Sequence, residues 1–251
     1  MSQEPLIAVF VDFENLALGV RDLKGGGQFE MQLVLKRLLE KGRIVYKRAY
    51  CDWSQYRTYV KEFHAQGVEM IDIPQTRQSG KNSADIHMVV DALDLCYAKQ
   101  HIDIFALLSG DSDFSPLVSK LKENNKRVIG CGVKSSTSDL LRAGCDEFIY
   151  YDDLARTARK TKGRGGRTDR KAEAMDRLVQ IVESMTGDYD QIWGSMVKQT
   201  IKRVYPGFNE SYYGYGSFSE MLKDCESRGL IRLEYDKNRG NYLVASGGKG
   251  A

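Results

Sequence analysis

The sequence predicts an α/β protein, in which a parallel sheet flanked by helices precedes a small winged-helix unit of the α+β class. Three observations support this prediction. Short apolar runs bounded by turn residues alternate with helical patterns over residues 5–151. A basic tract containing glycine follows them. The remaining residues show helical periodicity and then two strand-like runs around a turn.

Composition places the chain among globular proteins. Its 251 residues are 42% hydrophobic and 28% charged, which is ordinary for such a protein. No run approaches the roughly 18 apolar residues of a membrane span, and residues 1–5 carry no basic, apolar signal. We therefore expect a cytoplasmic protein without a membrane partner.

Cysteine and histidine patterns argue against a zinc site or a disulfide framework. The five cysteines are scattered without a CxxC pair, and the three histidines show no metal-ligand spacing. Cys96 and Cys131 lie in apolar runs, so we expect them to be small core residues.

The net charge of +3 comes from one short segment. Residues 155–171 hold 8 basic residues and 1 acidic residue, whereas the flanking parts are close to neutral. We interpret this tract as a flexible linker, and its basic side chains, Arg164 and Arg167 among them, as an arm that contacts RNA phosphates. The alternative is a solvated spacer. The expected organisation is a first domain at 1–154, the linker, a second domain at 172–246 and a tail at 247–251.

The expected elements of the first domain follow in order. Continuously apolar runs indicate strands that are covered on both faces. Strands are expected at 5–11, 43–51, 68–73, 102–109, 127–133 and 148–151, and helices at 29–39, 55–66, 83–99, 117–124 and 138–143. Residues 75–82 form an exposed polar loop in this interpretation, with Lys81 near its end.

Acidic side chains stand where two of these strands end. Asp12 follows the first strand, while Asp111 and Asp113 follow the fourth after Gly110. The simpler explanation is that Asp111 or Asp113 merely caps the next helix. However, one cap needs only one Asp, and Asp85 stands in the first turn of another helix, at its positive end.

A parallel sheet would bring these carboxylates together at one edge. Two like charges about 4 Å apart repel by about 4 kcal/mol at an effective dielectric near 20. A divalent cation with oxygen ligands would relieve this repulsion, and Mg²⁺ in such sites also binds substrate phosphate. Asp12, Asp85 and Asp111 are therefore the candidate metal ligands.

Three segments resemble one known family. VDFENL, KNSADIHMVVDAL and LLSGDSDFSPLVSKLKENNKRVIGCG are together similar to the NYN domain, a branch of the PIN-like nucleases. The resemblance implies a Rossmann-like PIN fold and endoribonuclease activity dependent on Mg²⁺ or Mn²⁺. It implies metal-site roles for Asp12, Asp85 and Asp111, and auxiliary roles for Asn15, Ser109 and Asp113. Asp91 recurs in LabA-like relatives, but it lies about 240° around the helix from Asp85, so we expect it to be structural.

The second domain is expected to contain helices at 174–185, 191–204 and 218–227, followed by a hairpin that turns at 236–240. This plan and the segment YYGYGSFSEML resemble the LOTUS or OST-HTH domain, which implies RNA binding. Unpaired bases could stack on Tyr212, Tyr213 and Tyr215, although one or two of these tyrosines, like Phe218, could instead be core residues. Candidate phosphate contacts are Lys198, Lys202, Arg203, Lys237 and Arg239.

The leading expectation is an endoribonuclease that cleaves RNA, single-stranded in the first instance, by metal-activated water. The basic linker and the second domain would recruit the RNA. One alternative is a non-catalytic RNA-binding regulator with the same fold. Another is a haloacid-dehalogenase-like phosphatase, which the Glu14 in place of a second Asp disfavours. The sequence leaves open single-stranded DNA as a substrate and the oligomeric state, a homodimer included.

Overall fold

The computed structural model describes residues 4–23, 27–74, 83–162 and 170–247. The chain divides into two compact units, Met1–Lys162 and Gly163–Ala251. The first contains a six-stranded parallel sheet in the order β3-β2-β1-β4-β5-β6. This confirms the predicted α/β class.

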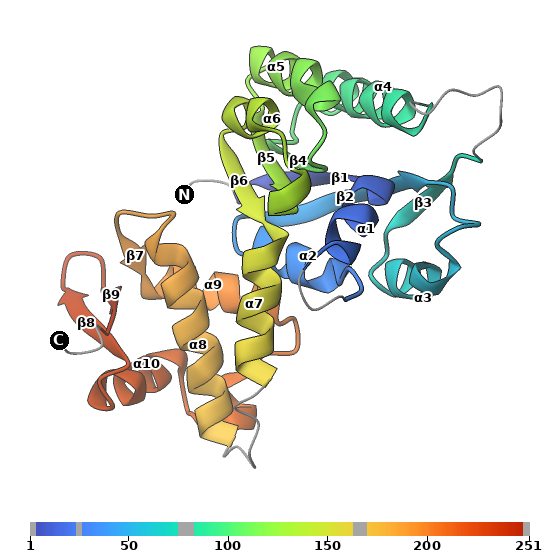
Figure 1. Ribbon diagram of the computed structural model, residues 1–251. Coiled ribbons are helices and arrows are strands. Elements are labelled where there is room, and N and C mark those ends of the chain that lie inside the picture. The colour runs from blue at the N-terminus through green and yellow to red at the C-terminus, as the bar shows by residue number, and fades with distance from the viewer. Residues whose placement is uncertain (1–3, 24–26, 75–82, 163–169, 248–251) are drawn as a thin grey trace. The chain divides into compact units, whose positions relative to one another are not determined.

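The sheet alternates with helices along the chain (Figure 1). The strands are β1 Leu6–Asp12, β2 Arg43–Cys51, β3 Glu69–Asp72, β4 Ile104–Leu108, β5 Arg127–Gly132 and β6 Glu147–Tyr150. The helices are α1 Phe13–Arg21, α2 Met31–Leu39, α3 Arg57–Ala65, α4 Ser83–Ala98, α5 Ser115–Glu123, α6 Asp139–Gly144 and α7 Tyr151–Lys162. Short 3-10 turns cover Ser112–Phe114 and Lys134–Ser136.

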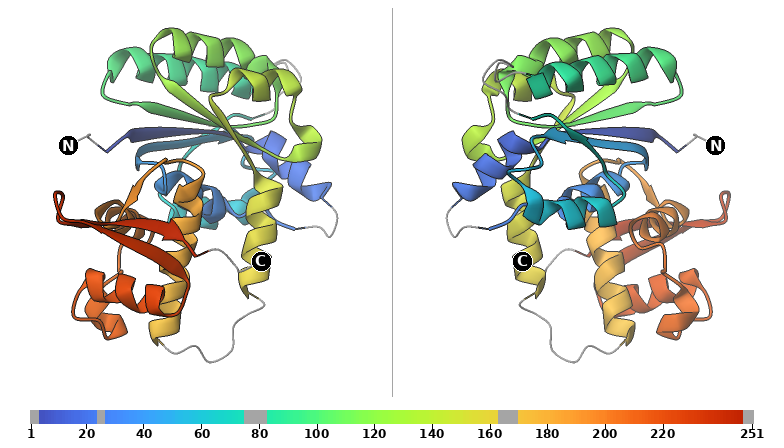
Figure 2. Two further views of the ribbon diagram at one scale, coloured as in Figure 1. Left: turned by 90° about the vertical axis from the view of Figure 1, so that its left-hand side faces the viewer. Right: turned by 90° about the vertical axis from the view of Figure 1, so that its right-hand side faces the viewer.

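Helices cover both faces of the sheet, which explains its continuously apolar strands. Successive residues of β1 enter two cores: Val9 and Val11 pack on one side, and Ala8 and Phe10 on the other. Helices α4, α5 and α6 lie over one face, and α1, α2 and α3 over the other (Figures 1 and 2). The period of two along each strand therefore sets which helices it supports.

Helix α1 was not among the predicted elements, and its first residue shows why it forms. Phe13 is fully buried and packs against an aromatic group made of Phe29, Trp53, Tyr56, Tyr59 and Phe63. Each such ring pair contributes about 0.5–1.5 kcal/mol beyond the burial of area. This packing holds the start of α1 against the sheet, and with it the adjacent Asp12.

Helix α7 corrects the predicted linker. Residues 155–162, expected to be flexible, continue this helix. Its start is anchored because Tyr151 is buried and Leu154 and Ala155 pack against the core. Asp153 also pairs with Arg156 one turn later. Tertiary packing at one end thus outweighs the polar composition of the rest.

The second unit contains three helices and a small antiparallel sheet ordered β7-β9-β8. Its elements are α8 Arg170–Thr186, β7 Ile192–Trp193, α9 Gly194–Val204, a 3-10 turn at Glu210–Tyr213, α10 Phe218–Ser227, β8 Ile231–Asp236 and β9 Asn241–Ser246. The helix expected at 191–204 instead begins at Gly194, because Ile192 and Trp193 pair with β9. The helices and the hairpin match the predicted winged-helix plan.

Candidate active site

The candidate site lies where the direction of the sheet changes. From β1 the chain runs outward through β2 to β3, and from β4 it runs the other way through β5 to β6. β1 and β4 are parallel neighbours, with Val11 opposite Leu108. Asp12 and the loop after Leu108 therefore share one sheet edge, the usual place for ligands in open α/β folds.

Asp12 is held from two elements. Its side chain is 8% exposed. One oxygen, Oδ1, accepts a hydrogen bond from the backbone N–H of Asn15 (3.3 Å), and the other, Oδ2, accepts one from Ser109 Oγ (2.8 Å). Asp12 thus caps α1 and also ties β1 to the end of β4.

The loop after β4 is fixed by the same network. Asn15 Oδ1 accepts from the backbone N–H of Gly110 (2.9 Å), and the N–H of Asp111 donates to Ser109 Oγ (3.1 Å). Gly110 is required here, since a Cβ at this position would lie 2.3 Å from the carbonyl oxygen of Ser136. Asn15 and Ser109, predicted as auxiliary residues, therefore position the two strand ends.

Asp111 does cap a short helical turn, as the simpler explanation proposed. Its Oδ1 accepts from the N–H of Asp113 (2.9 Å). Its Oδ2 makes no hydrogen bond to any residue in the described ranges. Capping therefore leaves part of this carboxylate available to a ligand. Asp113 itself is exposed.

Asp85 joins these groups from the first turn of α4, where it is half-buried. Burial raises the pKa of Asp85 to about 6, and the charges of Asp111, Asp113 and Glu14 raise it further in the same direction. Burial likewise raises the pKa of Asp12 to about 7, opposed by the Ser109 hydrogen bond and reinforced by Asp85 and Asp111. The three predicted acids are thus close enough to oppose each other's ionisation.

Glu14 is an acidic neighbour that was not selected as a site residue. It is the second residue of α1 and its charge acts on Asp85. Its position two residues after the end of a strand was the available signal.

The donor set fits a hydrated divalent cation. All candidate donors are carboxylate oxygens, which Mg²⁺ and Mn²⁺ prefer. Within the described ranges, no three Asp, Glu, His or Cys side chains are arranged to enclose an ion by themselves. Mg²⁺ commonly keeps several waters and takes only one or two carboxylates, so the arrangement suits a metal held partly through water.

A polar cavity of about 390 Å³ adjoins Asp111. The lining residues are mostly hydroxyl-bearing: Asn15, Gly110, Asp111, Ser112, Ser135, Ser136, Thr137 and Ser138. The run Ser135–Ser138 follows β5 and closes on the loop after β4 through a hydrogen bond from Ser138 N–H to Gly110 O (2.8 Å). The sequence analysis did not select this run, although its place after a strand end was a usable signal.

Asp91 is structural, as expected. Its Oδ2 accepts hydrogen bonds from Arg48 Nη1 and Tyr50 OH, both at 2.7 Å. Arg48 and Tyr50 belong to β2, so the interaction fastens α4 to the sheet. This attachment also sets where Asp85 stands.

The RNA-binding candidates of the second unit divide into two groups. Tyr213 and Tyr215 are only 6% and 2% exposed, and they pack in the core with Phe218. They are therefore core residues, as the alternative proposed, and the prediction that they stack bases is corrected. Lys198 is also engaged, by Glu210 (2.9 Å).

The other candidates of this unit are accessible. Tyr212 is 61% exposed and lies under the Arg170 guanidinium. Lys202, Lys237 and Arg239 are exposed, Arg239 over the Trp193 ring, whereas Arg203 is half-buried and donates to Thr200. Lys81, Arg164 and Arg167 lie outside the described residues. In the part of the chain that the structure describes, no helix is long and apolar enough to cross a membrane.

Comparisons with known proteins agree with this division. The NYN domain matches residues 6–152, and the OST-HTH/LOTUS domain matches residues 170–241. An uncharacterised protein of Methanocaldococcus jannaschii is 27% identical over 146 residues, which are 58% of this chain and 55% of that protein. The chain thus spans about half the length of this curated relative.

A solved structure resembles the first unit. The crystal structure of a protein of unknown function from Vibrio parahaemolyticus is 25% identical, with a TM-score of 0.54. The match covers 61% of this chain and 97% of that one. The two domain matches together indicate an RNA-related, nuclease-like protein.

Proposed function

The chain belongs to the NYN-domain family, and on this premise we propose that it is a Mg²⁺- or Mn²⁺-dependent endoribonuclease. The observation that supports the proposal best is the gathering of Asp12, Asp85 and Asp111 at the sheet edge between β1 and β4. Two of these acids have pKa values raised to about 7 and about 6. Such shifts in a cluster of like charges are typical of functional sites.

The three aspartates would hold the metal, which when bound supplies an activated water and stabilises the leaving oxygen of a phosphodiester. Ser109 holds the carboxylate plane of Asp12 through the 2.8 Å hydrogen bond. Asn15 fixes the loop that carries Asp111. The adjoining hydroxyl-lined cavity provides donors for a ribose or a phosphate. The products would carry 5′-phosphates.

The second unit would recruit RNA. Its LOTUS match and the exposed Tyr212, Lys237 and Arg239 support this role. A base stacked on an aromatic ring contributes about 1–3 kcal/mol. Cleavage and recruitment are thus assigned to separate units of the chain.

The deciding experiment is cleavage of labelled single-stranded RNA by purified full-length protein with Mn²⁺ or Mg²⁺. Asp111→Asn should abolish cleavage while keeping the fold, because Asn caps helical turns as well as Asp does. Circular dichroism and the urea midpoint would verify the fold. Turnover that persists in Asp111→Asn or in excess chelator contradicts the proposal. RNA binding without turnover in every metal tested would indicate a regulator instead.

A further inference from the structure

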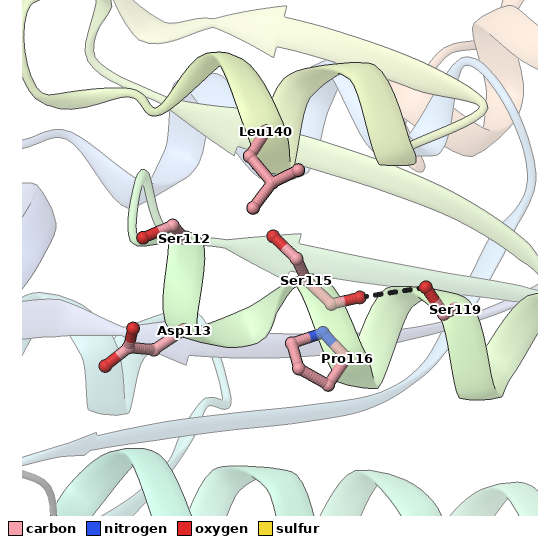
Figure 3. Close-up of a pocket in the computed structure, with 6 residues that line it drawn as sticks. All are labelled: Ser112, Asp113, Ser115, Pro116, Ser119 and Leu140. Atoms are coloured by element: carbon pink, nitrogen blue, oxygen red, sulfur yellow. Dashed lines mark hydrogen bonds between the residues drawn. The ribbon is translucent and has the colours of Figure 1, made fainter.

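A second cavity lies on the other side of the turn that carries Asp111. Its volume is about 650 Å³ and its lining residues are Ser112, Asp113, Ser115, Pro116, Ser119 and Leu140 (Figure 3). Ser112 also lines the hydroxyl-rich cavity, so the two hollows are neighbours. A volume of this size falls in the range of small-molecule sites, about 300–1,000 Å³.

One polar atom of this cavity lacks a partner. Ser115 Oγ is buried and makes no hydrogen bond in the described part of the chain. Its side chain points toward Leu140 of α6 (Figure 3). A buried hydroxyl without a partner calls for an explanation, and a ligand that supplies the missing hydrogen bond is one. Leu140 is 64% exposed, so a change of its rotamer could uncover the hydroxyl.

The charge of the lining selects the kind of ligand. The six lining residues include one carboxylate and no Lys or Arg, and the acids of the candidate metal site stand on the adjacent turn. This environment disfavours a second phosphate. It suits a neutral, flat group that contacts Leu140 and Pro116 and forms hydrogen bonds with serine hydroxyls.

We propose that this cavity is a subsite for one nucleobase of the RNA, next to the nucleotide whose phosphate is cleaved. The inference rests on the proposed endoribonuclease function and adds a contact outside the metal site. Serine hydroxyls both donate and accept, so the subsite holds a base without strong preference for its identity. Leu140 and Ser115 are its positioning residues.

The test uses single-stranded RNAs of one sequence with a single abasic nucleotide at successive positions, cleaved by full-length protein in Mn²⁺. In the wild type, kcat/KM should fall about tenfold when the abasic site occupies one position beside the scissile bond. Leu140→Ala and Ser115→Ala should lower kcat/KM on intact RNA and respond little to the same abasic site. The control is Val90→Ala, at a site 59% exposed on α4, which should respond as the wild type does.

Folding is monitored separately by urea denaturation. Ser115→Ala should keep or raise the denaturation midpoint, since it removes an unpaired buried hydroxyl. The inference is overturned if no abasic position affects the wild type, or if Leu140→Ala responds as strongly as the wild type. In both cases the nuclease assignment stands. Absence of cleavage by the wild type overturns the nuclease assignment and this inference together.

Discussion

Ser109 donates a hydrogen bond to Asp12 over 2.8 Å, although 97 positions separate the two residues. The bond joins the carboxyl ends of β1 and β4, and it lowers the pKa of Asp12 against the opposing effect of burial. Ser109 Oγ also accepts from the N–H of Asp111. One hydroxyl thus connects two of the three candidate metal ligands.

Replacing Ser109 with alanine should therefore impair the site without removing a carboxylate. The pKa of Asp12 should rise further, so the acid limb of the pH–rate profile shifts to higher pH and Mn²⁺ affinity at neutral pH falls. Loss of the buried hydrogen bonds should cost about 1–3 kcal/mol of stability. Cleavage rates over a pH series and urea denaturation would measure both effects.

The matched control for this substitution is Ser227→Ala. Its hydroxyl bonds only a backbone carbonyl of α10 in the other unit. This variant should keep the wild-type pH profile. A Ser109→Ala profile that coincides with the wild type would contradict the role given to Ser109.

The stability of the metal-free protein should depend on pH through Asp12 and Asp85. Their folded-state pKa values are about 7 and about 6, against 3.8 ordinarily. Below the ordinary value both groups are protonated in the folded and unfolded states, and their contribution to stability is complete. As the pH rises toward 7, the unfolded chain releases these protons first, so the free energy of unfolding falls.

Urea denaturation in EDTA over pH 4 to 7.5, a window spanning these pKa values, would check this. Mn²⁺ should restore stability at neutral pH, because it binds the deprotonated carboxylates. Asp12→Asn should flatten the pH dependence. An unfolding free energy of the wild type that increases across the window, with the Asp12→Asn variant unchanged, would contradict the assignment.

Asp91 should matter for stability and not for the chemistry. Asp91→Ala leaves the Tyr50 hydroxyl without its acceptor and Arg48 with Glu69 alone. The expected loss is roughly 1–3 kcal/mol, measured by urea denaturation. Cleavage measured well below the unfolding transition should stay within about twofold of the wild type, about 0.4 kcal/mol. A loss of activity as large as that of Asp111→Asn would place Asp91 in the metal site.

The tyrosines of the second unit should separate RNA binding from folding. Tyr212→Ala removes an exposed ring and should weaken RNA affinity by about five- to 150-fold if one base stacks there. Tyr215→Phe removes the hydrogen bond from its hydroxyl to Asp224 (2.9 Å). That variant should lose about 1 kcal/mol of stability and bind RNA normally. Fluorescence anisotropy and denaturation distinguish the two, and the reverse pattern would refute the assignment.

Local sequence patterns were sufficient for most elements of the fold. The strand predicted at 43–51 and the helix at 218–227 coincide with β2 and α10. Asp12, Asp85 and Asp111 could be selected because each follows a strand or opens a helix. Helix α1 and the helical residues 155–162 could not be predicted from composition, because distant partners anchor them, the aromatic group around Phe13 and the core beneath Tyr151.

By itself, the sequence determined the order of strands and helices, the two-unit organisation and the acids that stand at strand ends. Only the tertiary structure decided which hydroxyls support those acids, which tyrosines are buried, and that Ser135–Ser138 and Leu140 line cavities beside Asp111 and Asp113. The physical reason is that periodicity reports the face on which a side chain lies. Partners such as Ser109 and Asp12, 97 positions apart, meet only when parallel strands become neighbours.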